Sequence, residues 1–163
     1  MKRAVFLMPL TVLPACLLLA ELAFQTAMNV RDALSPSMQA LPKDGLPVSP
    51  EFAFSWIQAA TGGGMWLILA WSVWRGVGLL RGKTKLNTSS IMALAILLTF
   101  AAPSIGLWFW TIGDLLQGRF TVDLSNPAYA VSAFCQPFLL LLAVAAWRTA
   151  YTTQHHSTHF LSD

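Results

Sequence analysis

The sequence predicts an all-α fold: a membrane-embedded, antiparallel four-helix bundle that forms a single integral membrane domain over residues 1–163. A hydrocarbon core about 30 Å thick requires about 20 helical residues, and four apolar segments reach that length. Hydrophobic residues make up 56% of the chain and charged residues 10%, with a mean hydropathy of +0.60. A soluble domain of this size cannot bury so much apolar surface, so we expect the lipid bilayer to surround it. The predicted transmembrane helices are residues 4–24, 52–74, 90–112 and 128–147.

The first apolar segment follows the positively charged Lys2 and Arg3, an arrangement that a secretory signal also has. The chain stays apolar as far as Phe24, whereas a processed lipoprotein signal gives way to a polar tether. We therefore expect a retained helix. Pro9 and Pro14 each remove a backbone hydrogen bond, which predicts kinks.

The second segment begins with Ser49-Pro50-Glu51, which predicts an N-cap, a proline at the first helical position and an acid in the first turn. With Ala59 and Ala60, three glycines form a face of small residues, including Ala60-x-x-x-Gly64, which favours close helix packing. A hinge or a substrate site is the alternative at these glycines. The glycines are Gly62, Gly63 and Gly64.

Similar signals mark the last two segments. Residues 87–89, Asn-Thr-Ser, offer N-caps before the third, and Asn126-Pro127 precedes the fourth. Pro103 and Pro137 predict kinks within them. Trp66 falls deep in the second segment, where it is expected to pack against another helix. The aromatic residues expected near the membrane interfaces are Trp74, Trp108, Trp110, Tyr129 and Trp147.

Basic residues predict the orientation. Seven lie at the amino end, in the connection 75–89 and at the start of the tail, against three in the connections 25–51 and 113–127, which hold five acids. Because positive residues stay cytoplasmic, both termini and the basic loop 75–89 should lie inside (N-in/C-in), with 25–51 and 113–127 as outer loops. Contact with anionic headgroups is the simplest role of the basic loop.

The longer outer loop contains several prolines and is expected to be irregular, with one helical turn near residues 31–34. It connects the first two spans, and a role in binding a partner is the alternative. The polar tail 149–163 is expected to fray after one or two helical turns.

Three of the polar side chains within the predicted spans are candidate functional positions. Glu21 lies about one turn from the outer end of its span, where it can reach the interface or accept a hydrogen bond from the second span; an ion path or a partner contact are alternatives. Gln58 and Gln136 are expected to bond to neighbouring helices, with ligand contact as the alternative.

No constellation of residues predicts catalysis, a cofactor or a metal site. Cys16 and Cys135 form no C-x-x-C motif, and both are expected to be small apolar packing residues. His155 and His159 have helical i, i+4 spacing but lack further ligands. No histidine lies within a span, which excludes bis-histidine haem binding there. The sequence contains no nucleotide-binding loop, no Gly-x-Ser-x-Gly hydrolase motif and no zinc metalloprotease motif. The basic residues beside the spans are expected to set the orientation of the chain and not to bind nucleic acid.

Two stretches of the sequence are similar to sequences found in other proteins. The second span ends in Trp74-Arg75 and leads to Leu79-Leu80-Arg81-Gly82-Lys83, and the fourth closes with a leucine-rich run ending in Trp147-Arg148. With these stretches the chain resembles a broad family of small bacterial four-span membrane proteins of unknown function. The resemblance covers about the last two thirds of the chain and implies no catalytic residues.

The expected function is that of a multi-pass protein of the bacterial cytoplasmic (inner) membrane. We expect a non-enzymatic accessory or regulatory protein that acts through helix–helix contacts with a membrane-protein partner or in a homo-oligomer. One alternative is an immunity protein against a pore-forming toxin. The second alternative is a small transporter or channel component.

Overall fold

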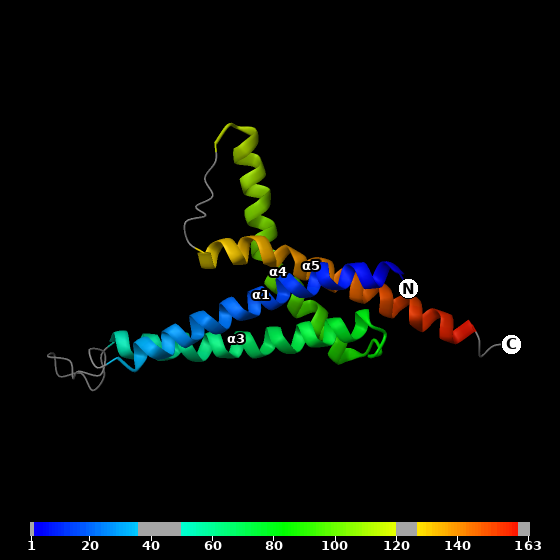
Figure 1. The fold of residues 1–163 in the computed structure, drawn as a ribbon, viewed down its shortest axis with the longest axis horizontal. Coiled ribbons are helices and arrows are strands. Elements are labelled where there is room, and N and C mark those ends of the chain that lie inside the picture. Colours follow the sequence, from blue (N-terminus) through cyan, green and yellow to red (C-terminus); the bar gives the residue numbers. More distant parts are fainter. Residues whose placement is uncertain (1, 36–49, 120–126, 160–163) are drawn as a thin grey trace. The chain divides into compact units, whose positions relative to one another are not determined.

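The computed structural model describes residues 2–35, 50–119 and 127–159, and these parts of the chain are helical apart from short turns. The helices are α1 (Lys2–Ala33), α3 (Pro50–Leu80), α4 (Thr88–Leu116) and α5 (Pro127–His159) (Figure 1). Each contains a segment long and apolar enough to cross a membrane: Met8–Ala33, Glu51–Leu80, Thr88–Leu116 and Ala130–Gln154. The predicted all-α class with four helices of membrane length is confirmed for the described residues.

The helices are longer than the predicted spans. The turn expected near residues 31–34 is the end of α1, and the tail is helical as far as His159. The first residues of the basic loop, 75–80, belong to α3, and residues 113–116 belong to α4. Hydropathy marks only the apolar portion of a helix, whereas a helix continues into polar sequence until a residue ends it. Residues 36–49 and 120–126, which belong to the two connections predicted to lie outside, are not among the described residues.

Glycines end α3 and α4 with the same geometry. Gly82 has φ +68°, and the backbone N–H groups of Gly82 and Lys83 donate to the carbonyls of Leu79 and Gly78. Gly118 has φ +72° and makes the equivalent bonds at the end of α4. These are Schellman motifs, in which a left-handed residue that favours glycine satisfies the last helical carbonyls.

The helix starts follow the sequence signals. Asn87 is the N-cap of α4, and its side-chain oxygen accepts from the backbone N–H of Ser90 at 3.0 Å. The predicted cap at residues 87–89 is confirmed at its first position. α3 begins at Pro50 and α5 at Pro127, while the N-cap roles predicted for Ser49 and Asn126 lie outside the described residues.

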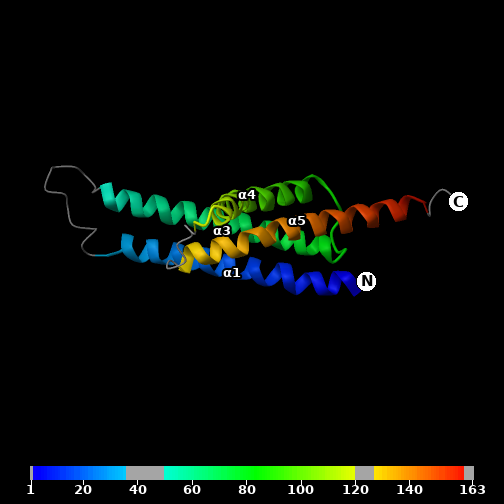
Figure 2. The same cartoon turned by 90° about the horizontal axis from the view of Figure 1, so that it is seen from above.

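The chain divides into two compact units: a larger unit (Met1–Leu18 and Leu69–Asp163) and a smaller unit (Leu19–Ile68). In the larger unit α4 packs along α5. Its leucine core comes from α3, α4 and α5, and the fully buried members are Leu69, Leu79, Leu97, Leu139 and Leu142. α4 contains Pro103 and changes direction along its length, in agreement with the predicted kink (Figures 1 and 2).

Candidate functional site

Gly62, Gly63 and Gly64 lie in the smaller unit, within the part of α3 that belongs to it. α3 is helical throughout, and positive φ angles occur, among the described residues, only at Gly82 and Gly118. The helix is therefore not unwound at Gly62, Gly63 and Gly64, while a hinge or a substrate site at these glycines stays a prediction. Glycine within a helix costs about 1 kcal/mol relative to alanine, so its presence there needs a packing reason.

At Gly62 the packing reason is the close approach of α1. A Cβ atom added at Gly62 would lie 2.7 Å from Thr26 Oγ1, closer than side chains tolerate. Thr26 Oγ1 already donates to the Leu22 carbonyl at 2.8 Å, so the hydroxyl is held in place over Gly62. The close approach expected for this glycine segment therefore occurs at Gly62, with Gly63 in ordinary contact with the Thr26 methyl group.

The packing face differs from the motif that the sequence suggested. Ala59 is buried, whereas Ala60 is exposed and a Cβ added at Gly64 would meet nothing within 4 Å. The face that packs contains Ala59, Gly62 and Trp66, which follow helical spacing. A run of small residues presents similar spacing on two adjacent faces, so sequence alone does not choose between them.

Trp66 joins α3 to α1. Its indole Nε1–H donates to the backbone carbonyl of Leu19 at 3.0 Å. Trp66 therefore packs against another helix, as expected from its depth in the span. An indole N–H that is withdrawn from water needs such an acceptor.

The polar candidates of the smaller unit are not brought together. Glu21 accepts a hydrogen bond from Gln25 on its own helix at 2.9 Å. Among the described residues no donor on α3 reaches Glu21, so the expected hydrogen bond from the second span is not formed in this structure. Gln58 is exposed and forms no hydrogen bond among the described residues. The two side chains therefore define no polar path within this unit.

In the larger unit a tryptophan makes the polar link between α4 and α5. Gln136 is half-buried and has no hydrogen bond among the described residues. Instead, Trp108 Nε1–H donates to the Ala133 carbonyl at 2.7 Å, and the Trp108 ring lies 5.3 Å from that of Phe134. Trp108 was expected at a membrane interface, and its role as an interhelical donor was missed.

Pro137 explains why this carbonyl needs an outside donor. In an α-helix the carbonyl of residue i accepts from the N–H of residue i+4, and Ala133 stands four residues before Pro137. Proline has no N–H, so the Ala133 carbonyl lacks its helical partner. The indole of Trp108 occupies that position. The sequence predicts a kink at Pro137. That prediction does not extend to the Ala133 carbonyl, which lacks a helical donor and accepts a hydrogen bond from Trp108.

Gly76 is a second packing site that sequence reasoning missed. It is buried in the larger unit, and a Cβ added there would lie 3.2 Å from Leu97 on α4 and 3.5 Å from Leu142 on α5. Gly76 therefore lies where three helices meet. The basic loop predicted at 75–89 includes Gly76, whereas in the structure Gly76 belongs to α3.

The described residues hold no group of three or more His, Cys, Asp or Glu side chains placed to bind a metal. Cys16 is exposed, Cys135 is buried, and both are free thiols. Only Cys135 therefore occupies the packed position expected of both cysteines. The side chains of His155, His156, His159 and Tyr129 lie outside those that the structure describes.

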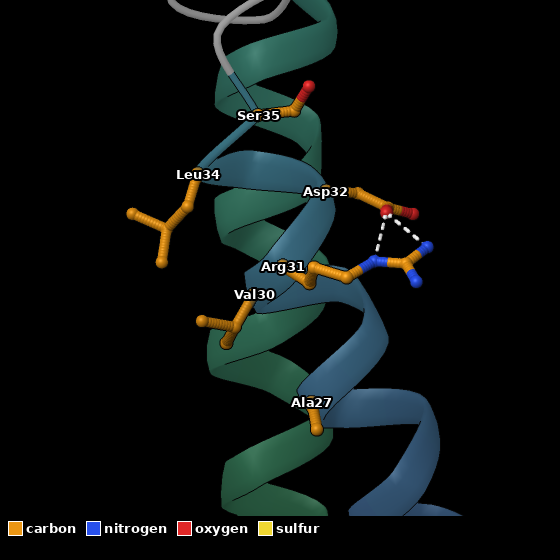
Figure 3. A pocket seen from close by; sticks show the side chains of 6 residues that line it. All are labelled: Ala27, Val30, Arg31, Asp32, Leu34 and Ser35. Atoms are coloured by element: carbon orange, nitrogen blue, oxygen red, sulfur yellow. Dashed lines mark hydrogen bonds and ion pairs between the residues drawn. The ribbon is translucent and has the colours of Figure 1, made fainter.

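The end of α1 borders an open cavity of about 720 Å³ (Figure 3). Arg31 and Asp32 point toward each other and form an ion pair at 3.0 Å, away from Val30 and Leu34. Both charged side chains are more than half exposed, so water screens the pair and it adds little stability. The remaining lining residues, Ala27 and Ser35, add no ligand constellation.

Comparisons with known proteins assign no family. No family model matches the chain, and neither a curated protein nor a solved structure matches it.

Proposed function

We propose that the chain is a multi-pass protein of the bacterial cytoplasmic membrane, with both termini inside, that acts without catalysis as an accessory or regulatory subunit. The observation that carries this proposal is how little of each apolar segment packs against the rest of the chain. In an apolar stretch of 18 residues within α1 17% of residues are buried, and in the corresponding stretch of each of the other helices 33%. Lipid or another protein has to cover the remainder, because water solvates such surfaces poorly.

Helix contacts support an antiparallel bundle. In the smaller unit Trp66 contacts Leu19 and the earlier Gly62 contacts the later Thr26, as two helices of opposite direction require. In the larger unit the end of α4 and the start of α5 meet at Trp108 and Ala133. Four crossings in alternating directions return the chain to its starting side, in agreement with the charge distribution.

An unused stripe of small residues supports action through helix contacts. Ala60 is exposed and a Cβ added at Gly64 would meet nothing within 4 Å, and their spacing suits the close approach of a second helix. Exposed Ile57, Leu67 and Ile68 border this stripe on α3. In lipid, a stripe of small residues favours association because backbones approach closely and gain dispersion contacts. Both a second copy and another membrane protein remain candidates for the partner.

Cross-linking in intact membranes tests the proposal. We expect the double variant Ala60→Leu/Gly64→Leu to lose most of the cross-linked species that the unaltered chain forms, about fivefold or more. Ala95→Leu is the matched control, because Ala95 is an exposed alanine on α4. Equal cross-linking of all three proteins would refute action through this stripe.

Reporter fusions in the same strains test location and orientation. Fusions at Lys83 and Asp163 should report a cytoplasmic position, and a reporter inserted at Gly45 should report the outer side. Recovery of the chain as a monomer in a detergent-free soluble fraction would refute the membrane assignment altogether.

A further inference from the structure

The turn that joins α3 to α4 borders a cavity of about 220 Å³ within the larger unit. One water molecule needs roughly 10–15 Å³, so the cavity has room for a larger group. Three of its lining residues are cationic and none is acidic. The lining residues are Trp74, Arg75, Val77, Gly78, Arg81, Lys83 and Thr84.

The positive charges of this cavity are not neutralised within the described part of the chain. Arg75, Arg81 and Lys83 form no ion pair there. The sequence offers no nearby acid either, since residues 75–89 contain none. Like charges that gather without counter-charges repel one another, and an anion bound between them relieves that repulsion.

Arg75 is held beside the start of a second helix. Its Nη2 donates to Asn87 Oδ1 at 3.3 Å and to Ser89 Oγ at 3.0 Å, and Asn87 is the N-cap of α4. A helix N-terminus carries partial positive charge, so a guanidinium there lies in an unfavourable field. Both acceptors are neutral, and an anion at this position would interact favourably with the side chain and the helix end together.

Two buried polar atoms of the cavity residues have no hydrogen-bond partner in the described structure. These are Nε of Arg75 and Oγ1 of Thr84. A Cβ atom added at Gly78 would lie only 2.9 Å from Thr84 Oγ1. The glycine therefore leaves space for this hydroxyl. Buried donors without partners are rare and costly, and a ligand is one of the ways in which they are satisfied.

We propose that this cavity binds a phosphate group, supplied by the headgroup of an anionic phospholipid. Phosphate offers several acceptor oxygens to the fixed donors of a guanidinium, and basic pockets between transmembrane helices on the cytoplasmic side hold acidic headgroups. Trp74 borders the cavity with 68% of its surface exposed, as expected for a ring at the headgroup level. Only the lipid source of the phosphate rests on the proposed membrane function.

Native mass spectrometry of the full-length protein, purified in mild detergent and titrated with phosphatidylglycerol or phosphatidylcholine, tests this site. The unaltered chain should retain one phosphatidylglycerol in preference to phosphatidylcholine. Arg81→Gln and Lys83→Gln should each lower its occupancy about tenfold, the factor for the loss of one hydrogen bond to a charged group. Arg75→Gln should lower it at least tenfold, because its guanidinium carries the central donors.

Lys85→Gln is the matched control, because Lys85 is exposed on the same turn and does not line the cavity. It should retain phosphatidylglycerol. If Lys85→Gln and Lys83→Gln lower the occupancy equally, the basic loop attracts lipid without a site and the proposal is overturned. Arg81 and Lys83 are also exposed, so their variants test the site even if Arg75→Gln does not fold.

Two further measurements separate the explanations. If inorganic phosphate raises the melting temperature of the protein in phosphatidylcholine and displaces the bound lipid, the ligand is free phosphate and the lipid assignment fails. Membrane fractionation of the same proteins reports on location alone. A membrane-inserted chain without preference for phosphatidylglycerol refutes the site, whereas a soluble chain refutes the proposed function.

Discussion

Trp66 in the smaller unit and Trp108 in the larger unit make the same kind of contact with different consequences. Each indole N–H donates to a backbone carbonyl of a neighbouring helix, at 3.0 Å and 2.7 Å. The carbonyl of Leu19 has Ala23 four residues later, which carries an N–H, whereas that of Ala133 has Pro137. The indole is an additional donor in the first case and a replacement donor in the second.

This difference indicates that the stability lost with an interhelical hydrogen bond depends on whether its acceptor still has another donor. A carbonyl with a helical partner remains satisfied after the tryptophan is lost. A buried carbonyl without one is left unsatisfied, which costs about 1–3 kcal/mol, whereas an average hydrogen bond contributes about 1 kcal/mol. Mutations at the two tryptophans should therefore differ in effect.

We expect the largest effect from Trp108→Phe. The substitution keeps an aromatic ring beside Phe134 but leaves the Ala133 carbonyl without a donor, and should lower the free energy of unfolding by about 1–3 kcal/mol. Reversible unfolding in mixed detergent micelles measures this change.

Pro137→Ala serves as the control in a double-mutant cycle. Alanine restores the missing backbone N–H, so Trp108→Phe should cost much less in the Pro137→Ala background. An equal cost in both backgrounds would show that the proline and the tryptophan act independently.

An intermediate effect is expected at the glycines of the smaller unit. Gly62→Ala should destabilise the protein by about 1 kcal/mol, because the new methyl group meets the hydroxyl of Thr26. Gly64→Ala, two residues away, has free space and should be neutral or stabilise α3 by up to about 1 kcal/mol. The same unfolding measurement applies, and effects of the same sign at both positions would contradict the assigned packing face.

The smallest effect is expected from Trp66→Phe, about 0.6 kcal/mol, the average found for interhelical hydrogen bonds in membranes. The Leu19 carbonyl keeps its helical donor, so little beyond the indole bond is lost. A cost equal to that of Trp108→Phe, measured in the same micelles, would remove the distinction between the two carbonyls.

Local signals in the sequence predicted much of the fold. Apolar length predicted the helices of membrane length, and Asn87, Pro50 and Pro127 marked where helices begin, because capping and proline geometry depend on adjacent residues. Helix ends were predicted less well. The left-handed turn at Gly82 is a local signal that could have ended the second helix at residue 80 instead of residue 74.

The candidate site depended more on contacts between distant residues. The glycines of α3 were recognised as packing residues, but the choice of Gly62 rather than Gly64 depends on where Thr26 lies. Trp108 and Ala133 are 25 positions apart, and only the folded arrangement shows that one serves the other. Pro137 was the available clue, because a proline always leaves the carbonyl four residues before it without a helical donor.

The connection between α3 and α4 has a consequence for how the protein is made. Its Schellman turn, its N-cap and the contacts of Arg75 with Asn87 and Ser89 all involve residues close together in the chain. Contacts of such low sequence separation form quickly. With the proposed membrane location, we expect α3 and α4 to insert as a paired hairpin before synthesis of α5 is complete, and Leu142 to pack against Gly76 when the last helix is added.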